Sequence, residues 1–235
     1  MRIRFDRKRS LGSSLAIAAL SVAAYLVLFP AASDSHGQKA SCGPTGSETV
    51  VVDRAARVYR VTTGHDPFGT LHSYYGCAVG HAKSQLLARS AFRGIRLYSC
   101  VVSECRLVRA IRLVGATVGV IVERHGTDTV NTTLTVRDLA AGHVLHTVQA
   151  HTVVGYGDSL ITYVLARSGN IAWATVTTSP GPHGALQRNG AIYSAVGHTV
   201  STLDTGPKVS ARSLRLRGDT VEWIDGGQQR TASLS

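Results

Sequence analysis

The sequence predicts an all-β domain built from repeated antiparallel hairpins, preceded by an N-terminal hydrophobic helix. Three observations lead to this prediction. After residue 48 the chain consists of short β-prone runs separated by Gly, Asp, Asn and Ser clusters, without sustained helical periodicity. A pattern of strand, Gly turn and strand recurs along it. The first thirty residues instead combine a basic start with an uncharged apolar run. With 44% hydrophobic and 17% charged residues, the composition excludes a disordered tail and a multi-pass membrane protein.

The N-terminal segment has the pattern of an export signal. Residues 2–9 carry five basic groups against one acid, and residues 11–29 contain no charged side chain. Ala31 and Ser33 suit the −3 and −1 positions of a cleavage site, which predicts a cut before Asp34. An uncleaved anchor is the alternative, because nineteen residues make roughly 28 Å of helix, close to the hydrocarbon thickness of a bilayer.

The chain therefore divides into three predicted parts. Residues 1–33 are a signal peptide or a single-span signal anchor, residues 34–48 a linker and residues 49–235 the β domain. The basic N-terminus stays in the cytoplasm in either case, so the domain is expected outside it, secreted or anchored in the cell membrane. Removing residues 1–33 reduces the net charge from +11 to +7, which leaves 20 basic and 13 acidic residues.

Four cysteines remain after export, and an even number in an oxidising compartment favours disulfides. Cys100 and Cys105 enclose only four residues, which fits a bridge across a tight hairpin. Cys42 is then left to tie the N-terminal segment to Cys77. A zinc site is the alternative, but the four cysteines lack the paired spacing of one.

Nine β-prone runs justify the predicted strands. In chain order they are residues 49–53, 56–62, 117–124, 132–139, 143–151, 159–166, 170–178, 211–218 and 220–225. Only residues 82–92 are compatible with a short helix. Residues 179–198 contain two prolines and four glycines and are predicted to be a surface insertion. This insertion is the expected binding element, because loops on a rigid β scaffold commonly carry function.

Internal repetition organises these strands. The pattern around a Gly turn occurs at 111–120 (IRLVGATVGV), 163–173 (YVLARSGNIAW) and 214–223 (LRLRGDTVEW), with turn glycines 54 and 49 residues apart. A second pattern, Asp beside Leu before a Gly turn, occurs at 134–145 and 200–210. Residues 49–234 accommodate about four units of about 46 residues.

These repeats resemble the blades of WD-type and quinoprotein-type β-propellers. With ARVYR at 56–60, YGC at 75–77 and the L-x-x-x-x-V-x-W hairpin at 216–223, the chain resembles uncharacterised exported propeller-like proteins of high-GC actinobacteria. The resemblance implies a four-bladed ring or an open, partial one. It implies no particular function, because propellers include lectins, enzymes and scaffolds. A β-sandwich built of the same hairpins is the alternative fold.

Candidate sites are few. No HExxH, P-loop or paired-carboxylate spacing is present, so no catalytic residue, metal ligand or cofactor is predicted, and an enzyme is the less expected class. His143, His146 and His151 alternate between strand faces and are predicted to be solvent-facing side chains. Trp173 and Trp223 occupy equivalent places in two repeats and are predicted to lie in core layers.

The densest basic groups are those of Arg106, Arg109 and Arg112 and those of Arg212, Arg215 and Arg217. Alternation in 211–218 turns Leu214 and Leu216 inward and the arginines outward. They are then either a solvated strand edge that discourages aggregation or a patch for an anionic partner. The export signal and the lack of interleaved aromatic residues exclude nucleic acid. We therefore expect a non-catalytic extracytoplasmic binding or scaffold module for an envelope component or a protein partner, attached to the membrane through its N-terminal segment. The alternative is an envelope hydrolase with a loop-built active site.

Overall fold

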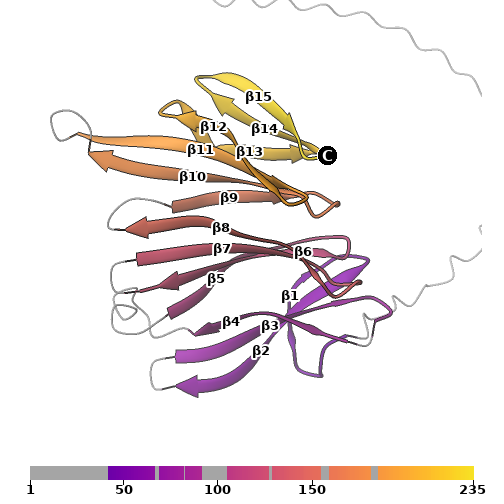
Figure 1. Cartoon of the computed structure of the whole chain (residues 1–235). Coiled ribbons are helices and arrows are strands. Elements are labelled where there is room, and N and C mark those ends of the chain that lie inside the picture. The colour runs from indigo at the N-terminus through magenta and orange to yellow at the C-terminus, as the bar shows by residue number, and fades with distance from the viewer. Residues whose placement is uncertain are drawn as a thin grey trace, which may run out of the picture. The chain divides into compact units, whose positions relative to one another are not determined.

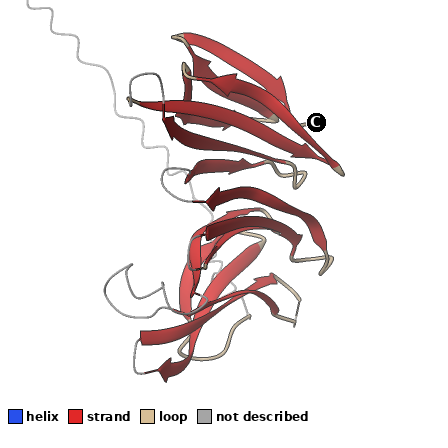
Figure 2. Ribbon diagram, turned by 60° about the vertical axis from the view of Figure 1, so that its left-hand side comes forward, coloured by secondary structure: helices blue, strands red, loops and turns tan. Residues whose placement is uncertain are grey.

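The computed structural model describes residues 42–66, 69–81, 83–91, 105–126, 129–154, 159–180 and 185–235. Every regular element among these residues is a β-strand (Figure 2), so the all-β prediction is confirmed. In chain order the strands are β1 (Glu48–Val52), β2 (Ala56–Asp66), β3 (Gly69–Ala78), β4 (Gln85–Ala91), β5 (Cys105–Val114), β6 (Thr117–His125), β7 (Thr129–Asp138), β8 (Val144–Val154), β9 (Ser159–Leu165), β10 (Ile171–Pro180), β11 (Leu186–Val196), β12 (Thr199–Gly206), β13 (Val209–Arg217), β14 (Thr220–Asp225) and β15 (Gln228–Ser233).

The strands form four antiparallel meanders, in each of which consecutive strands pair (Figure 1). The first meander contains β1–β4, the second β5–β8, the third β9–β12 and the fourth β13–β15. The first two meet edge to edge through a single residue pair, Ala91 and Arg106. The number of meanders therefore agrees with the four units that the repeats predict.

Each predicted Gly turn is the hairpin between the first and second strands of a meander. Gly115 lies between β5 and β6, Gly169 between β9 and β10, and Gly218 between β13 and β14. Their φ angles are 61°, 92° and 61°. Only glycine adopts this left-handed region without steric cost, which explains why the turn residue recurs in all three repeats.

One hydrogen bond recurs in all four meanders. The residue directly after the third strand donates its N–H to the turn between the first and second strands. The pairs are Val79 N to Ala55 O at 2.8 Å, Leu139 N to Ala116 O at 2.9 Å, Gly197 N to Asn170 Oδ1 at 3.2 Å and Leu234 N to Asp219 O at 2.7 Å. The acceptor is a main-chain carbonyl in three meanders and a side-chain amide oxygen in the third. The four units are thus repeats in their hydrogen bonding, and the last three also share the Gly-turn pattern in sequence.

Neighbouring meanders pack face to face through apolar side chains. In β10, Ile171 and Trp173 pack with the second meander, whereas Ala172 and Ala174 pack with the fourth. Successive side chains of a strand point to opposite faces, so a strand between two sheets is buried on both sides. Similar apolar clusters link the first meander to the second and the second to the third, and no cluster among the described residues joins the fourth to the first.

Two sequence-based expectations for individual segments are wrong. The expected helix at 82–92 is largely strand β4, in which Ala88 and Ser90 are buried and Arg89 between them is exposed. The expected insertion at 179–198 is mainly part of the β10–β11 hairpin, paired from Ile171 with Ala195 onward. Sheet pairing outweighs the Pro and Gly content there; residues 181–184 lie outside the described residues.

The second sequence pattern does not mark equivalent turns. Asp138 ends β7 and its Oδ1 accepts the N–H groups of Ala140 and Ala141, which holds the turn to β8 within one meander. Asp204 lies in β12, and the following turn leads from the third meander to the fourth. The two segments therefore share a sequence pattern but not a place in the repeat.

The predicted signal peptide or anchor at residues 1–33 lies outside the described residues. Among the described residues, no helix has the length and apolar character that a membrane crossing requires.

Candidate binding groove

The first strand of each of the first three meanders contains a β-bulge. Val50 in β1, Arg109 in β5 and Ile161 in β9 are extra residues without a partner in the neighbouring strand. A bulge bends its strand and redirects the side chain of the extra residue. All three bulged residues line cavities between the first strands of successive meanders. We call the two cavities together the β5 groove, because β5 contributes to both.

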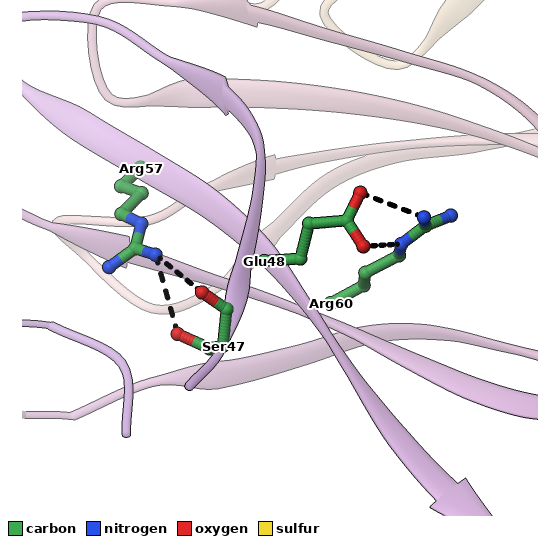
Figure 3. Close-up of polar contacts among 4 residues, drawn as sticks. All are labelled: Ser47, Glu48, Arg57 and Arg60. Carbon is green, nitrogen blue, oxygen red and sulfur yellow. Dashed lines mark hydrogen bonds and ion pairs between the residues drawn. The ribbon is translucent and has the colours of Figure 1, made fainter. Parts of the chain in front are cut away.

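The first cavity of the groove has a volume of about 290 Å³ and lies between the first and second meanders. Its polar lining includes Arg60, Tyr74, Glu48 and Arg109. Figure 3 shows that the Arg60 guanidinium forms two parallel bonds with the Glu48 carboxylate, both 2.7 Å long. The bond to Glu48 and a second one to Tyr74 raise the pKa of Arg60 above its ordinary value. This pair therefore presents a fixed, locally neutral wall.

The Arg57 side chain, also drawn in Figure 3, fixes the segment that leads into β1. Its guanidinium donates to the main-chain oxygens of Cys42 and Ser47, at 3.1 and 3.2 Å. Arg57 also lies over the Tyr59 ring, 5.5 Å from the ring centroid. These contacts hold the edge of the first meander beside the groove.

The second cavity has a volume of about 270 Å³ and lies between the second and third meanders. It shares Arg109 and Ala110 with the first cavity, so the two adjoin along β5. Arg109 Nε forms an ion pair with Glu123 Oε2 at 3.0 Å, and the same oxygen lies 3.2 Å from His125 Nε2. The Glu123 side chain is 12% exposed, so these two partners compensate a largely buried carboxylate.

Arg112 is held differently from the other two arginines. Its guanidinium carbon lies 5.1 Å from the centroid of the Tyr163 ring, and Tyr163 Oη donates to Gly119 O at 2.7 Å. Burial raises the pKa of the Tyr163 hydroxyl far above its ordinary value, so the ring is neutral. Because Gly119 has no side chain, the ring can approach it; a Cβ there would lie 2.9 Å from Tyr163 Cε2. The ring supports Arg112 as a fixed platform.

The groove has a cationic surplus. Its lining contains three arginines (Arg60, Arg109 and Arg112) and two carboxylates (Glu48 and Glu123). The carboxylates pair with Arg60 and Arg109, and the exposed Arg112 has no carboxylate partner among the described residues. The arrangement is therefore suited to receive one negatively charged group beside Arg112.

The arginine patch predicted at Arg212, Arg215 and Arg217 lies elsewhere, on β13. All three side chains are exposed, while Leu214 between them is buried. Arg217 Nε lies 3.5 Å from Glu222 Oε1, and Arg215 is the cross-strand neighbour of Glu222. Glu222 offsets part of the basic charge there. The patch as a site for an anionic partner stays a prediction.

The three candidate histidines do not form a metal site. His143 is exposed, whereas His146 and His151 are half-buried, so the expectation of three solvent-facing side chains is only partly confirmed. Burial and the nearby His198 lower the pKa of His146, and a hydrogen bond with Asn170 opposes this shift. No group of three or more potential metal ligands occurs among the residues that the structure describes.

Both tryptophans lie in core layers between meanders, as predicted from their equivalent places in the repeats. Trp173 is 3% exposed and its Nε1 donates to Ala150 O in β8. Trp223 is 5% exposed and its Nε1 donates to Asp204 Oδ2 in β12. In both cases the acceptor belongs to the last strand of the preceding meander, so each indole joins two neighbouring sheets.

One predicted disulfide is present. Cys42 and Cys77 are bonded, with Cα atoms 6.0 Å apart, and both are buried against Tyr59. Cys105 is also disulfide-bonded and lies buried at the start of β5. Its predicted partner, Cys100, lies outside the described residues, so that pairing stays a prediction.

Sequence reasoning identified Arg109 and Arg112 as basic residues but not as lining a groove. The bulge at Arg109 arises from pairing between β5 and β6, and no local sequence signal marks it. The Gly turn at 115 was the one available indication that these arginines lie on the first strand of a repeat.

Comparison with known proteins adds no assignment: no protein-family model and no curated protein matches the chain.

Proposed function

We propose that the chain is an extracytoplasmic, non-catalytic binding or scaffold module for an envelope component or a protein partner, and that the β5 groove is its binding surface. The N-terminal pattern of basic residues followed by an apolar run supports export and attachment to the membrane. The Cys42–Cys77 disulfide is consistent with an oxidising compartment.

We further propose that the four meanders are arranged as successive propeller-like blades. The support is that their first strands contact one another in order: β1 contacts β5, β5 contacts β9, and β9 contacts β13. In a propeller, the blades are arranged radially around a central channel. A two-sheet sandwich, the alternative fold, accounts less well for four separate meanders.

The observation that carries the binding proposal is the bulged Arg109, shared by two adjoining cavities. A bulge at this position redirects a cationic side chain toward the space between meanders. Bound ligands in β proteins are commonly held between rigid elements by a few convergent polar groups. The groove provides such a set on strands, which position side chains more precisely than loops do.

Binding to isolated envelope material tests the proposal. The full chain and an Arg109→Gln, Arg112→Gln double variant are mixed with purified cell-wall and membrane fractions, and the bound protein is measured by co-sedimentation. The expected result is binding that the double variant loses. A matched control, the double variant Arg212→Gln, Arg217→Gln, removes the same charge from β13 and should still bind the envelope fractions.

A hydrolytic activity would contradict the proposal. The same preparations are therefore assayed on esterase, glycosidase and phosphatase substrates. Turnover by the full chain would favour the envelope hydrolase instead, and equal binding by both double variants would show that the β5 groove is not the binding surface.

A further inference from the structure

We infer that the β5 groove binds a linear glycan that bears spaced carboxylate or phosphate groups, one of which is held by Arg112 together with Arg109. This inference rests on the proposed binding function and specifies its ligand. It differs from the patch predicted on β13, because it places the anionic ligand between the second and third meanders.

The bulge explains how two arginines three positions apart reach one cavity. In a regular strand, side chains at positions i and i+3 point to opposite faces. The extra residue at Arg109 breaks this alternation, and Arg109, Ala110 and Arg112 all line the second cavity. Without the bulge, Arg109 and Arg112 would lie on opposite faces of β5.

Both arginines retain unused donors. The Arg109 side chain is 56% exposed beside its ion pair with Glu123, which leaves part of its guanidinium open to another acceptor. The Arg112 guanidinium lies over the Tyr163 ring, and the exposed side chain has no hydrogen-bond acceptor among the described residues, so its N–H groups remain available to a ligand. A carboxylate or a phosphate ester matches such planar donors, because it accepts two parallel hydrogen bonds.

The carboxylates of the groove favour a hydroxylated ligand over a simple polyanion. Glu48 and Glu123 line the two cavities beside the arginines. They would repel a densely charged chain, whereas sugar hydroxyl groups can donate to them. Tyr74 and Thr162 add further hydroxyl groups to the lining. The alternating lining therefore matches a glycan whose charges are separated by neutral polar units.

The size of the cavities favours a polymer over a small molecule. Volumes of about 290 and 270 Å³ lie just below the range of about 300–1,000 Å³ that small-molecule sites occupy. The cavities adjoin at Arg109 and Ala110, so one chain can cross β5 and place a unit in each. The bulged Arg109 then lies at the crossing point.

Calorimetric titration of the full chain tests the inference. The probes are hyaluronan, which carries a carboxylate on every second sugar, a sparsely phosphorylated dextran, which carries spaced phosphates, neutral dextran, and phosphatidylglycerol vesicles. The variant is Arg112→Gln, and the matched control is Arg217→Gln, which removes the same charge on β13. Thermal unfolding of both variants verifies that they remain folded.

The expected result is that one of the two charged polymers binds and dextran does not. Loss of a charge-assisted contact worth about 1.5–3 kcal/mol predicts binding that is about 10- to 100-fold weaker in Arg112→Gln. Arg217→Gln should change the affinity less than twofold. Arg112→Lys keeps the charge without the planar donors, so its affinity should lie between those of Arg112→Gln and Arg217→Gln.

Three outcomes would overturn the inference. Equal weakening by Arg112→Gln and Arg217→Gln would indicate general electrostatic attraction, and binding to vesicles but to neither polymer would indicate a lipid surface. Failure to bind any probe, while the full chain still co-sediments with envelope material, would reject the glycan and leave the binding function in place.

Discussion

Replacing Asn170 tests the hydrogen bonding that joins the meanders. Asn170 occupies the turn between β9 and β10, where its Oδ1 accepts the N–H of Gly197 and its Nδ2 donates to the main-chain oxygen of Leu234. The first bond closes the third meander and the second reaches the end of the fourth. Asn170→Ala removes both bonds, together with the side-chain hydrogen bond to His146, and leaves the backbone in place.

The two bonds to main-chain groups set the expected cost, because the partner of the third, His146, is only half-buried. A hydrogen bond within a protein contributes about 0.5–1.5 kcal/mol net, and a buried group left without its partner costs about 1–3 kcal/mol. Leu234 is fully buried, so its oxygen has limited access to water. The two losses together predict a decrease of about 2 kcal/mol in the free energy of unfolding.

Urea unfolding at 25 °C and pH 7.5, followed by tryptophan fluorescence, measures this change. Asn189→Ala is the matched control, because the same substitution in β11 removes a half-buried side chain that makes no hydrogen bond among the described residues. Asn170→Asp keeps the acceptor for Gly197 but places a carboxylate against the oxygen of Leu234, so it should not rescue stability. A loss below about 0.5 kcal/mol, or equal to that of Asn189→Ala, would refute the reasoning.

Three further predictions concern separate features. Gly119→Ala places a methyl group against the buried Tyr163 ring and should reduce the free energy of unfolding by about 1–3 kcal/mol. The control Gly64→Ala should cost less, because its Cβ would lie an ordinary 3.5 Å from Leu71 Cδ1. Equal losses in the two variants would contradict this packing. The folded-state pKa of His146 lies below the ordinary 6.5, so the unfolded chain binds the proton more readily. The free energy of unfolding should be level above about pH 7 and should fall as the pH drops below about 6.5. The fall between pH 7.5 and 5.5 should be smaller in His146→Gln, and an identical pH profile in that variant would exclude this role. Replacing both Cys42 and Cys77 by Ser opens a loop with a sequence separation of 35. Urea unfolding should show a decrease of about 3–4 kcal/mol in the free energy of unfolding. An unchanged free energy would indicate that the bond does not constrain the unfolded chain.

Sequence reasoning predicted the strands whose own residues form a β-prone pattern, without information on which strand they pair with. Residues 170–178 form a continuous β-prone run because β10 lies between two sheets and is buried on both faces. In contrast, β11 begins with Leu186–Gly190, a segment rich in polar residues and glycine, and β4 resembles a short helix. Both become strands through pairing with β10 and β3, which no local pattern specifies.

The groove depends even more on distant pairing. Arg109 and Arg112 were recognisable as basic residues, but their common cavity requires the bulge, the approach of Tyr163 to Gly119 and the packing of the second meander on the third. The contact between Tyr163 and Gly119 joins residues that lie 44 positions apart in the sequence. Composition identified the charge, and only the tertiary structure located it.

The order of the apolar clusters has a consequence for unfolding. Because each cluster joins only adjacent meanders among the described residues, stability should approximate a sum of unit terms and nearest-neighbour interface terms. Amide protons of β6 and β10, which lie between two packed faces, should then exchange most slowly, and those of β15 earlier. The disulfide beside Tyr59 and Tyr75 gives the first meander a covalent end cap, whereas the fourth has no disulfide among its residues. Opening is therefore expected to begin at the C-terminal end and proceed one meander at a time.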